Sequence, residues 1–119
     1  MGEERPLVDI GLRGLKVTKY RKSAKGQPCQ VRIPGVCNFD DSTTVLAHLN
    51  GGGMGLKRND IHGAFCCSSC HDVLDGRATL PKSLYVKRAE DLLRDIKLMH
   101  LEGVIRTQEI MIKAGILKL

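Results

Sequence analysis

The residues of this 119-residue chain best suited to chemistry are cysteines and histidines in close groups. Cys67, Cys70 and His71 form a Cys-x-x-Cys-His run, and another cysteine pair, Cys29 and Cys37, lies upstream. In a short chain, two close cysteine pairs are the usual way to build a tetrahedral thiolate site for a structural zinc ion. We therefore predict that these four cysteines hold one Zn²⁺.

A fifth cysteine, Cys66, leaves a choice of ligand. It could replace Cys67 at a spacing of four from Cys70. We favour Cys67, because a helix that begins near this residue would put positions 67 and 70 on one face. Cys66 is then expected to be a buried thiol outside the metal site.

The histidine of the run is expected to work apart from the cysteines. Successive helical residues turn by about 100°, so His71 would point away from the zinc and toward a neighbouring element. We expect that element to be the short strand that carries His48. Two facing imidazoles beside a basic surface suit a divalent ion and a phosphodiester. A lone histidine such as His100 is more simply a partly buried side chain.

The segments around these residues predict a small α+β fold. Residues 27–38 should form a knuckle with a turn at Pro34-Gly35, and residues 43–50 should form a strand that ends at a polar site. A second strand is expected over 63–66. A short helix, capped by Ser68, should follow it and end at Gly76. A glycine-rich loop, 51–55, separates the two strands.

The last third of the chain predicts helix. A long helical region should open at Pro81 or Ser83, with an apolar stripe that includes Leu92, Ile96, Met99 and Gly103. Beyond Gly103 the pattern predicts a second helix or a continuation. We divide this single domain into a basic N-terminal arm (1–26), a zinc-bound core (27–80) and a helical extension (81–119) that packs on the core or on a partner, which would allow a homodimer.

Charge and composition favour a polyanionic partner. The net charge is +6, the pI is about 9.2, and six basic residues fall within thirteen positions that contain no acid: Arg13, Lys16, Lys19, Arg21, Lys22 and Lys25. They are our candidates for nucleic-acid phosphate contacts, within an arm that has one strand; a solvated, flexible arm is the alternative. No leader peptide or membrane-spanning stretch is apparent, so we expect a cytoplasmic protein whose cysteines bind metal.

Several of these motifs together resemble the HNH (ββα-metal, His-Me finger) nuclease superfamily. The similarity rests on the order of the first cysteine pair, Ala47-His48-Leu49-Asn50, Asn59-Asp60 and the Cys-x-x-Cys-His run. The stretches 53–57 and 70–77 more closely resemble the small phage and prophage YbcO-like nucleases. The resemblance implies a zinc-stabilised ββα-metal core with a helical C-terminal extension.

The resemblance also implies roles for individual residues. His48 would be the general base and His71 would bind a catalytic Mg²⁺ or Mn²⁺ ion. Asn59 is our candidate for the middle polar residue of the motif, with Asp60 and His62 as competitors. Many such nucleases have a metal-binding Asp or His where this chain has Ala47, so Asp60, His62, Asn50, water or substrate oxygens would complete the ion's ligands.

These observations predict a metal-dependent DNA endonuclease that acts on double-stranded or branched DNA in phage or prophage DNA recombination or processing. RNA is also open as a substrate. The main alternative is a non-catalytic zinc-knuckle module for DNA binding or adaptor function, which would have no need to place His48 and His71 together. A c-type haem would leave Cys29 and Cys37 unexplained, and a redox Cys-x-x-Cys lacks the surrounding βαβ pattern.

Overall fold

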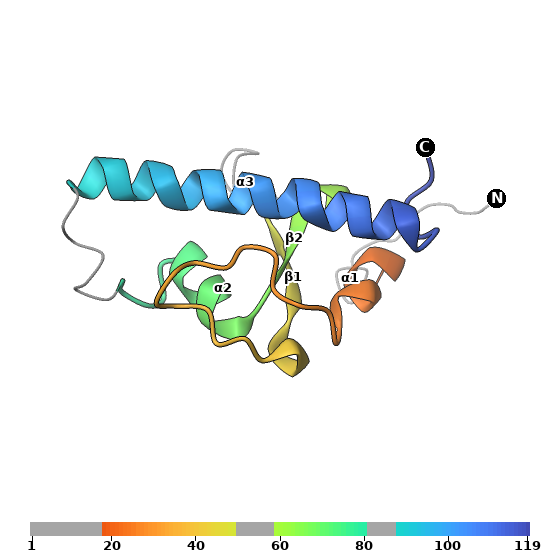
Figure 1. The fold of residues 1–119 in the computed structure, drawn as a ribbon, viewed down its shortest axis with the longest axis horizontal. Helices are drawn as coiled ribbons and strands as arrows, with labels where there is room; N and C mark the ends of the chain where they lie inside the picture. Colours follow the sequence, from red (N-terminus) through yellow and green to blue (C-terminus); the bar gives the residue numbers. More distant parts are fainter. Residues whose placement is uncertain (1–17, 50–58, 81–87) are drawn as a thin grey trace, which may run out of the picture.

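A single long helix lies along one side of the molecule, and the other elements pack beneath it (Figure 1). The structure is a computed structural model that describes residues 18–49, 59–80 and 88–119. Its helices and strands follow in the order α1 (Lys19–Ala24), β1 (Val45–His48), β2 (Gly63–Cys66), α2 (Ser68–Leu74) and α3 (Ala89–Lys113), with 3₁₀ turns η2 at Asp41–Thr43 and η3 at Asp60–His62. The predicted α+β class is confirmed.

The two strands form an antiparallel hairpin whose faces point into different parts of the core. The register pairs Leu46 with Phe65 and Ala47 with Ala64. Leu46 and Phe65 belong to one buried cluster, whereas Ala47 and Ala64 belong to another that also contains cysteines of the predicted zinc site. Because side chains alternate along a strand, this small sheet divides the core into two halves.

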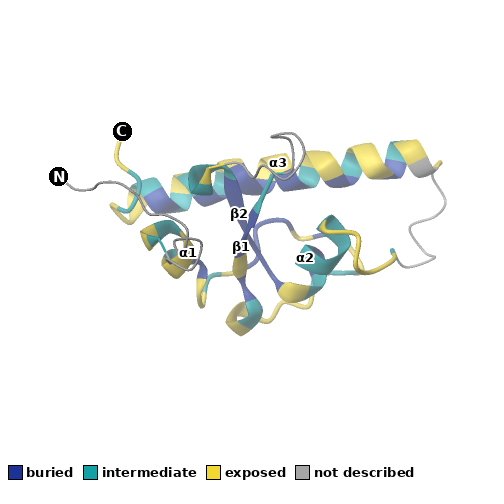
Figure 2. Ribbon diagram, turned by 180° about the vertical axis from the view of Figure 1, so that it is seen from behind, coloured by how far each residue is buried: buried dark blue, intermediate teal, exposed yellow. Residues whose placement is uncertain are grey.

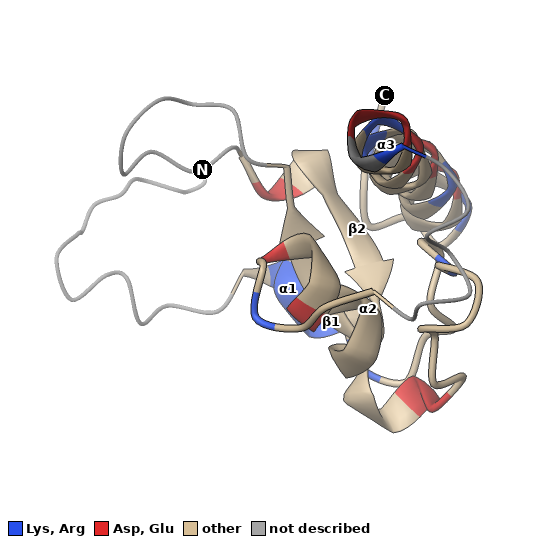
Figure 3. Cartoon of the chain, turned by 90° about the vertical axis from the view of Figure 1, so that its left-hand side faces the viewer, with Lys and Arg blue, Asp and Glu red and all other residues tan. Residues whose placement is uncertain are grey.

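The α3 helix packs closely on β2, as the view along its axis shows (Figure 3). At the point of contact is Gly103, where a Cβ atom would lie 3.1 Å from the carbonyl oxygen of Gln30 and 3.3 Å from the Cβ of Ala64. The absence of a side chain at Gly103 therefore allows the close approach. Leu92 and Ile96 are buried, as the apolar stripe predicted.

Polar side chains of α3 also bind backbone groups of the other elements. The His100 Nε2 donates to the carbonyl oxygen of Ala47 at 2.9 Å, and Arg106 donates to that of Gln30 at 2.6 Å. The Thr107 hydroxyl accepts from the backbone N–H of Phe65 at 2.8 Å. Gln108 donates to the carbonyl oxygen of Ile61 at 2.6 Å. The helix thus satisfies backbone groups of both strands, of the knuckle and of η3.

Several sequence-based expectations need correction. Residues 19–24 form a helix instead of an irregular arm with one strand, because Thr18 caps its first turn and Ala24 is buried against the core. The first strand begins at Val45, because residues 41–43 close a 3₁₀ turn capped by Asp40. The α2 helix is capped by the Cys67 sulfur rather than by Ser68.

Other expectations are confirmed or lie outside the described residues. The second strand has its predicted bounds, and α3 continues through Gly103 as one helix of 25 residues. The predicted start of that helix at Pro81 or Ser83 and the glycine-rich loop 51–55 fall outside the described residues. The three-part division of the chain stays a prediction. Within the described ranges, no helix has the length and apolar character needed to cross a membrane.

Candidate active site and metal centre

Four cysteines converge at the junction of the knuckle with α2. The sulfur atoms of Cys29, Cys37, Cys67 and Cys70 all lie within 4.8 Å of one another. The knuckle brings its pair together through the turn after Ile33, whose carbonyl oxygen accepts from the Cys37 backbone N–H at 2.9 Å. The other two sulfur atoms come from Cys67, which is the N-cap of α2, and from Cys70, in the first turn of that helix. These are the four residues that the sequence predicted, and the group includes Cys67 rather than Cys66, as expected.

The chemistry of this group fits a metal ion. Burial raises the pKa of Cys37 to about 11, and negative charge on Cys29 adds to the effect, whereas hydrogen bonds with Cys66 and Cys70 hold the pKa of Cys29 far below its ordinary value. Without a cation, the four crowded cysteines cannot all be deprotonated, because the negative charge of each thiolate disfavours deprotonation of its neighbours. A divalent cation would remove that repulsion, and four sulfur ligands fit the closed tetrahedral shell of structural zinc.

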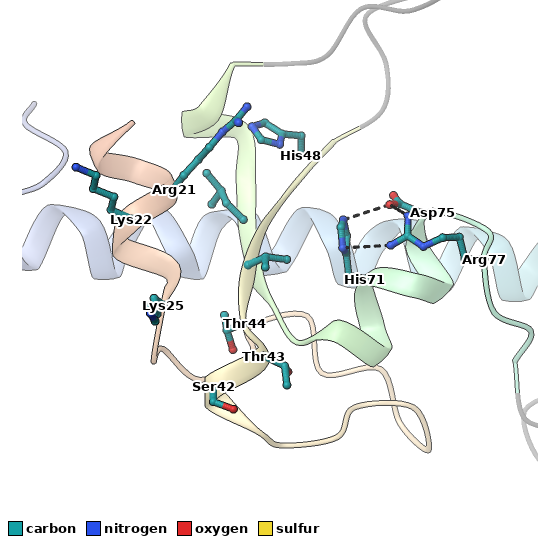
Figure 4. Close-up of a pocket in the computed structure, with 12 residues that line it drawn as sticks. Arg21, Lys22, Lys25, Ser42, Thr43, Thr44, His48, His71, Asp75 and Arg77 are labelled. Carbon is teal, nitrogen blue, oxygen red and sulfur yellow. Dashed lines mark hydrogen bonds and ion pairs between the residues drawn. The ribbon is translucent and has the colours of Figure 1, made fainter. Parts of the chain in front are cut away.

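A cavity of about 830 Å³ opens between α1, β1 and α2, and none of the four cysteines lines it (Figure 4). His48, at the end of β1, and His71, in α2, both line it. The structure therefore brings together the two histidines that the sequence predicted to share a site. The other lining residues come from α1, η2, β1 and the end of α2: Arg21, Lys22, Lys25, Ser42, Thr43, Thr44, Val45, Leu46, Asp75 and Arg77.

The His48 imidazole is held by the Asp60 carboxylate. The Nε2 of His48 lies 2.5 Å from an Asp60 oxygen, and the Asp60 side chain is only 12% exposed. Thr18 donates its hydroxyl to the other oxygen at 2.5 Å, and Arg21 contacts the carboxylate at 3.3 Å. Burial alone would raise the pKa of Asp60, but the hydrogen bonds from Thr18 and His48 and the charge of Arg21 lower it overall.

This arrangement fixes the proton on one ring nitrogen of His48. Because Asp60 is ionised at neutral pH, its oxygens can only accept hydrogen bonds. The Nε2 of a neutral His48 must therefore carry the proton, which leaves a free electron pair on Nδ1. A histidine in this state can take a proton from water through Nδ1.

His71 has a carboxylate partner of its own on the wall of the cavity. Its Nε2 lies 3.2 Å from Asp75, four residues later in the chain, and its Nδ1 lies 3.5 Å from the Arg77 guanidinium. Figure 4 shows these three side chains together at the end of α2. The same Asp75 oxygen also accepts from Arg77 at 2.7 Å, so a divalent ion held by His71 and Asp75 would have to take the place of this guanidinium group.

Other predicted site residues are placed differently. Asn59 is exposed at the start of η3, and its side chain makes no capping hydrogen bond. The Nδ1 of His62 is buried without a hydrogen-bond partner in the described part of the chain. Of the three candidates for the middle motif residue, Asp60 is the one that contacts His48. Asn50 falls outside the described residues.

The basic candidates divide into three groups. Arg21, Lys22 and Lys25 line the cavity. Lys19 is absent from the lining, and its ammonium group lies 5.3 Å from the centre of the Tyr20 ring. Arg13 and Lys16 are outside the described residues.

Sequence reasoning missed two charged residues of the cavity, Asp75 and Arg77, and the contact of Thr18 with Asp60. Asp75 had a usable signal, because it is four residues from His71 in a predicted helix and such positions share a face. Thr18 had none of comparable strength, because its partner lies 42 residues away.

Comparison with known proteins gives consistent matches. The family model described as "Putative nuclease YbcO" matches residues 18–116. "Putative nuclease YbcO" of Escherichia coli (strain K12) and "Putative nuclease ybcO" of Enterobacteria phage 82 are each 42% identical to the chain over 101 residues, which cover 82% of the chain and 95% of each relative. A solved structure, "Structure of a putative bacteriophage protein from Escherichia coli str. K-12 substr. MG1655", matches with a TM-score of 0.61 and 39% identity over 82% of this chain and 100% of that one.

Proposed function

The chain belongs to the YbcO family, and from that premise we propose that it is a metal-dependent DNA endonuclease of the HNH type. The names of its relatives describe nucleases. One observation carries the proposal: His48 and His71 line the same cavity, each with a carboxylate partner, among basic side chains. A general base, a ligand for a divalent ion and phosphate-binding groups are the parts that phosphodiester hydrolysis needs.

In this proposal His48 activates water. Its Nδ1 takes a proton from a water molecule, and the remaining hydroxide forms a bond to phosphorus while the bond to the leaving oxygen breaks. The protonated imidazole is stabilised by the ionised Asp60, which contacts Nε2. Asp60 therefore acts as a positioning residue, and the geometry favours it over Asn59 as the middle residue of the motif.

His71 and Asp75 would hold the catalytic ion, Mg²⁺ or Mn²⁺. Such an ion supplies positive charge for the phosphate oxygens and for the leaving oxygen. This placement differs from our suggestion of Asp60 as a ligand, because three side chains, His48, Thr18 and Arg21, hold that carboxylate. Asp75 is also held, by Arg77 at 2.7 Å, but it lies directly beside His71. Asp75 would also supply the carboxylate ligand that many such nucleases have at the position of Ala47.

The remaining wall of the cavity would bind the substrate. Arg21, Lys22, Lys25 and Arg77 can contact phosphates of double-stranded or branched DNA, and the hydroxyl groups of Ser42 and Thr43 can donate to them. Zinc held by the four cysteines would stay out of the reaction. Its role would be to fix the start of α2, and with it the position of His71.

The test is cleavage of supercoiled plasmid and of branched DNA with added Mg²⁺ or Mn²⁺. Wild-type protein should cleave, and His48→Ala and His71→Ala should each lower the rate by about 100-fold or more. Asp60→Asn should lose much of the activity, whereas Asn59→Ala should keep most of it. Zinc content and thermal melting serve as controls for the fold.

Unchanged cleavage by His48→Ala would overturn the assignment of the base. DNA binding without cleavage under any of these conditions would instead favour the non-catalytic zinc-knuckle module. Preferential cleavage of RNA would keep the site but change the substrate.

A further inference from the structure

The face of α3 that points away from the sheet carries exposed aliphatic side chains. Leu98 is 54% exposed, Leu101 43% and Ile105 66%, and all three lie opposite the buried stripe of the same helix. Figure 2 shows exposed residues along this outer side and buried ones along the inner side. Single exposed aliphatic residues are ordinary, but three at helical spacing form one apolar strip.

The residues of this strip are arranged symmetrically along the helix. Leu98 and Ile105 are equally distant from the midpoint between residues 101 and 102. Exposed charged residues continue the same symmetry with opposite signs: Arg94 corresponds to Glu109, and Glu90 corresponds to Lys113. Two antiparallel copies of α3 that cross at this midpoint would therefore place Leu98 against Ile105 and would set Arg94 and Glu90 against residues of opposite charge, with Leu101 and Glu102 on either side of the crossing point.

We propose that the outer face of α3 binds the same face of a second copy of this chain in an antiparallel, two-fold symmetric contact. In such a contact each pairing occurs twice, so the face must be complementary to itself. Leu98 would meet Ile105 of the second copy, and Leu101 would lie next to the crossing point, beside Glu102 of the second copy. A parallel arrangement would set Arg94 against Arg94 and Glu109 against Glu109, which the like charges disfavour.

The size of this face sets the strength of the contact. A helix of 25 residues is roughly 37 Å long, and one face of it offers about half of the 800 Å² per partner that a stable interface usually buries. We therefore expect a reversible dimer that forms in the micromolar range. The proposal is independent of the nuclease assignment, because no residue of α3 lines the cavity.

Sedimentation equilibrium of the full chain from about 1 to about 500 µM tests the proposal. The wild-type protein should change from monomer to dimer over this range. Arg94→Glu should weaken dimerisation by about tenfold, because it faces Glu109 twice in the dimer. Lys118→Glu, which changes the net charge equally at an exposed site outside α3, is the matched control and should have little effect.

The double variant Arg94→Glu with Glu109→Arg exchanges the two charges and should restore the wild-type affinity. A protein that stays monomeric throughout the range would overturn the proposal. So would a dimer that ignores Arg94→Glu, or one that the double variant fails to restore. All these side chains are exposed, and thermal melting of each variant checks that the fold is intact.

Discussion

Asp60 is the residue through which three parts of the molecule meet. Its carboxylate contacts His48 from β1, and Thr18 and Arg21 from the start of α1. It thus fixes which ring nitrogen of the proposed base carries the proton, and it holds the basic helix beside that base. A single residue sets both the chemistry and the position of the proposed substrate-binding surface.

The lowered pKa of Asp60 predicts how stability depends on pH. Its pKa lies below the ordinary value of 3.8 in the folded protein. The ionised side chain therefore stabilises the fold above pH 3.8, and this contribution disappears as the pH falls through the lower, folded-state pKa. Asp60→Asn should be less stable than wild type at pH 6, and the difference should shrink below about pH 4.

Urea denaturation of both proteins at several pH values between 3 and 7 measures the two free energies of unfolding. Glu102→Gln is a useful control, because it removes an exposed carboxylate on α3, which lines no part of the cavity. A difference between wild type and Asp60→Asn that grows on acidification would contradict the assignment.

The residues of the site were predictable to the extent that type and spacing identify them. Cysteine pairs and a strand histidine carry their own signal, and the structure groups them as expected. The choice among Asn59, Asp60 and His62 could not be made, because it depends on how the connection between the strands folds back onto His48. That geometry comes from long-range contacts and not from spacing.

At the scale of elements, α2 separates the two chemistries of the Cys-x-x-Cys-His run. Its first turn carries cysteines of the metal centre, and His71 points from the same helix into the cavity. The metal centre and the proposed active site are therefore joined by one short helix. Loss of a zinc ion held by these cysteines should disturb His71, even though none of the four cysteines lines the cavity.

The two adjacent cysteines provide a test of this view. Cys67→Ser keeps a side-chain acceptor at the start of α2 but removes a sulfur from the group, so it should lose the zinc and much of the folding free energy. Cys66→Ala removes an equally buried thiol outside the group. It should retain about one zinc per chain and cost only about 1 kcal/mol.

Zinc content after dialysis and thermal melting measure both effects. Zinc loss from Cys66→Ala together with zinc retention by Cys67→Ser would reverse the ligand assignment. Chelator treatment of the wild-type protein should reproduce the behaviour of Cys67→Ser.

Elements with a strong periodic pattern were predicted well, and those held by tertiary contacts were not. Both strands and α2 were predicted close to their observed positions, and the helical pattern past Gly103, which allowed a second helix or a continuation, proved to be one helix. The α1 helix has six residues, of which only Ala24 is buried. A segment this short is marginal by itself. It is stabilised by the cap at Thr18 and by packing against the cluster of Leu46, Phe65 and Met111.

On the scale of the whole molecule, the fold places part of the excess positive charge on the side that carries the cavity. Part of the basic segment lies on α1, beside the cavity, whereas α3 packs on β2 and lines no part of the cavity. DNA would therefore approach the cavity side. Phosphate contacts release bound counterions, so the affinity should fall steeply as salt is added.

Replacing Lys22 and Lys25 together by Ala should weaken DNA binding and lower the slope of log K against log[salt] by about 2. Lys97→Ala with Lys118→Ala removes the same charge from exposed positions outside the cavity lining. This control should leave the slope nearly unchanged. Fluorescence anisotropy with a labelled duplex measures both proteins, and equal slopes would contradict the proposed binding face.

The hydrogen bonds from α3 to the backbone have a consequence for the order of folding during synthesis. His100, Arg106, Thr107 and Gln108 serve the knuckle, both strands and η3, yet all four leave the ribosome after those elements. Until these residues are synthesised, the hairpin lacks the hydrogen bonds from α3 and the close packing against Gly103. A nascent chain would hold the proposed catalytic side chains without a fixed cavity, so we expect the proposed nuclease activity to begin only once α3 has docked.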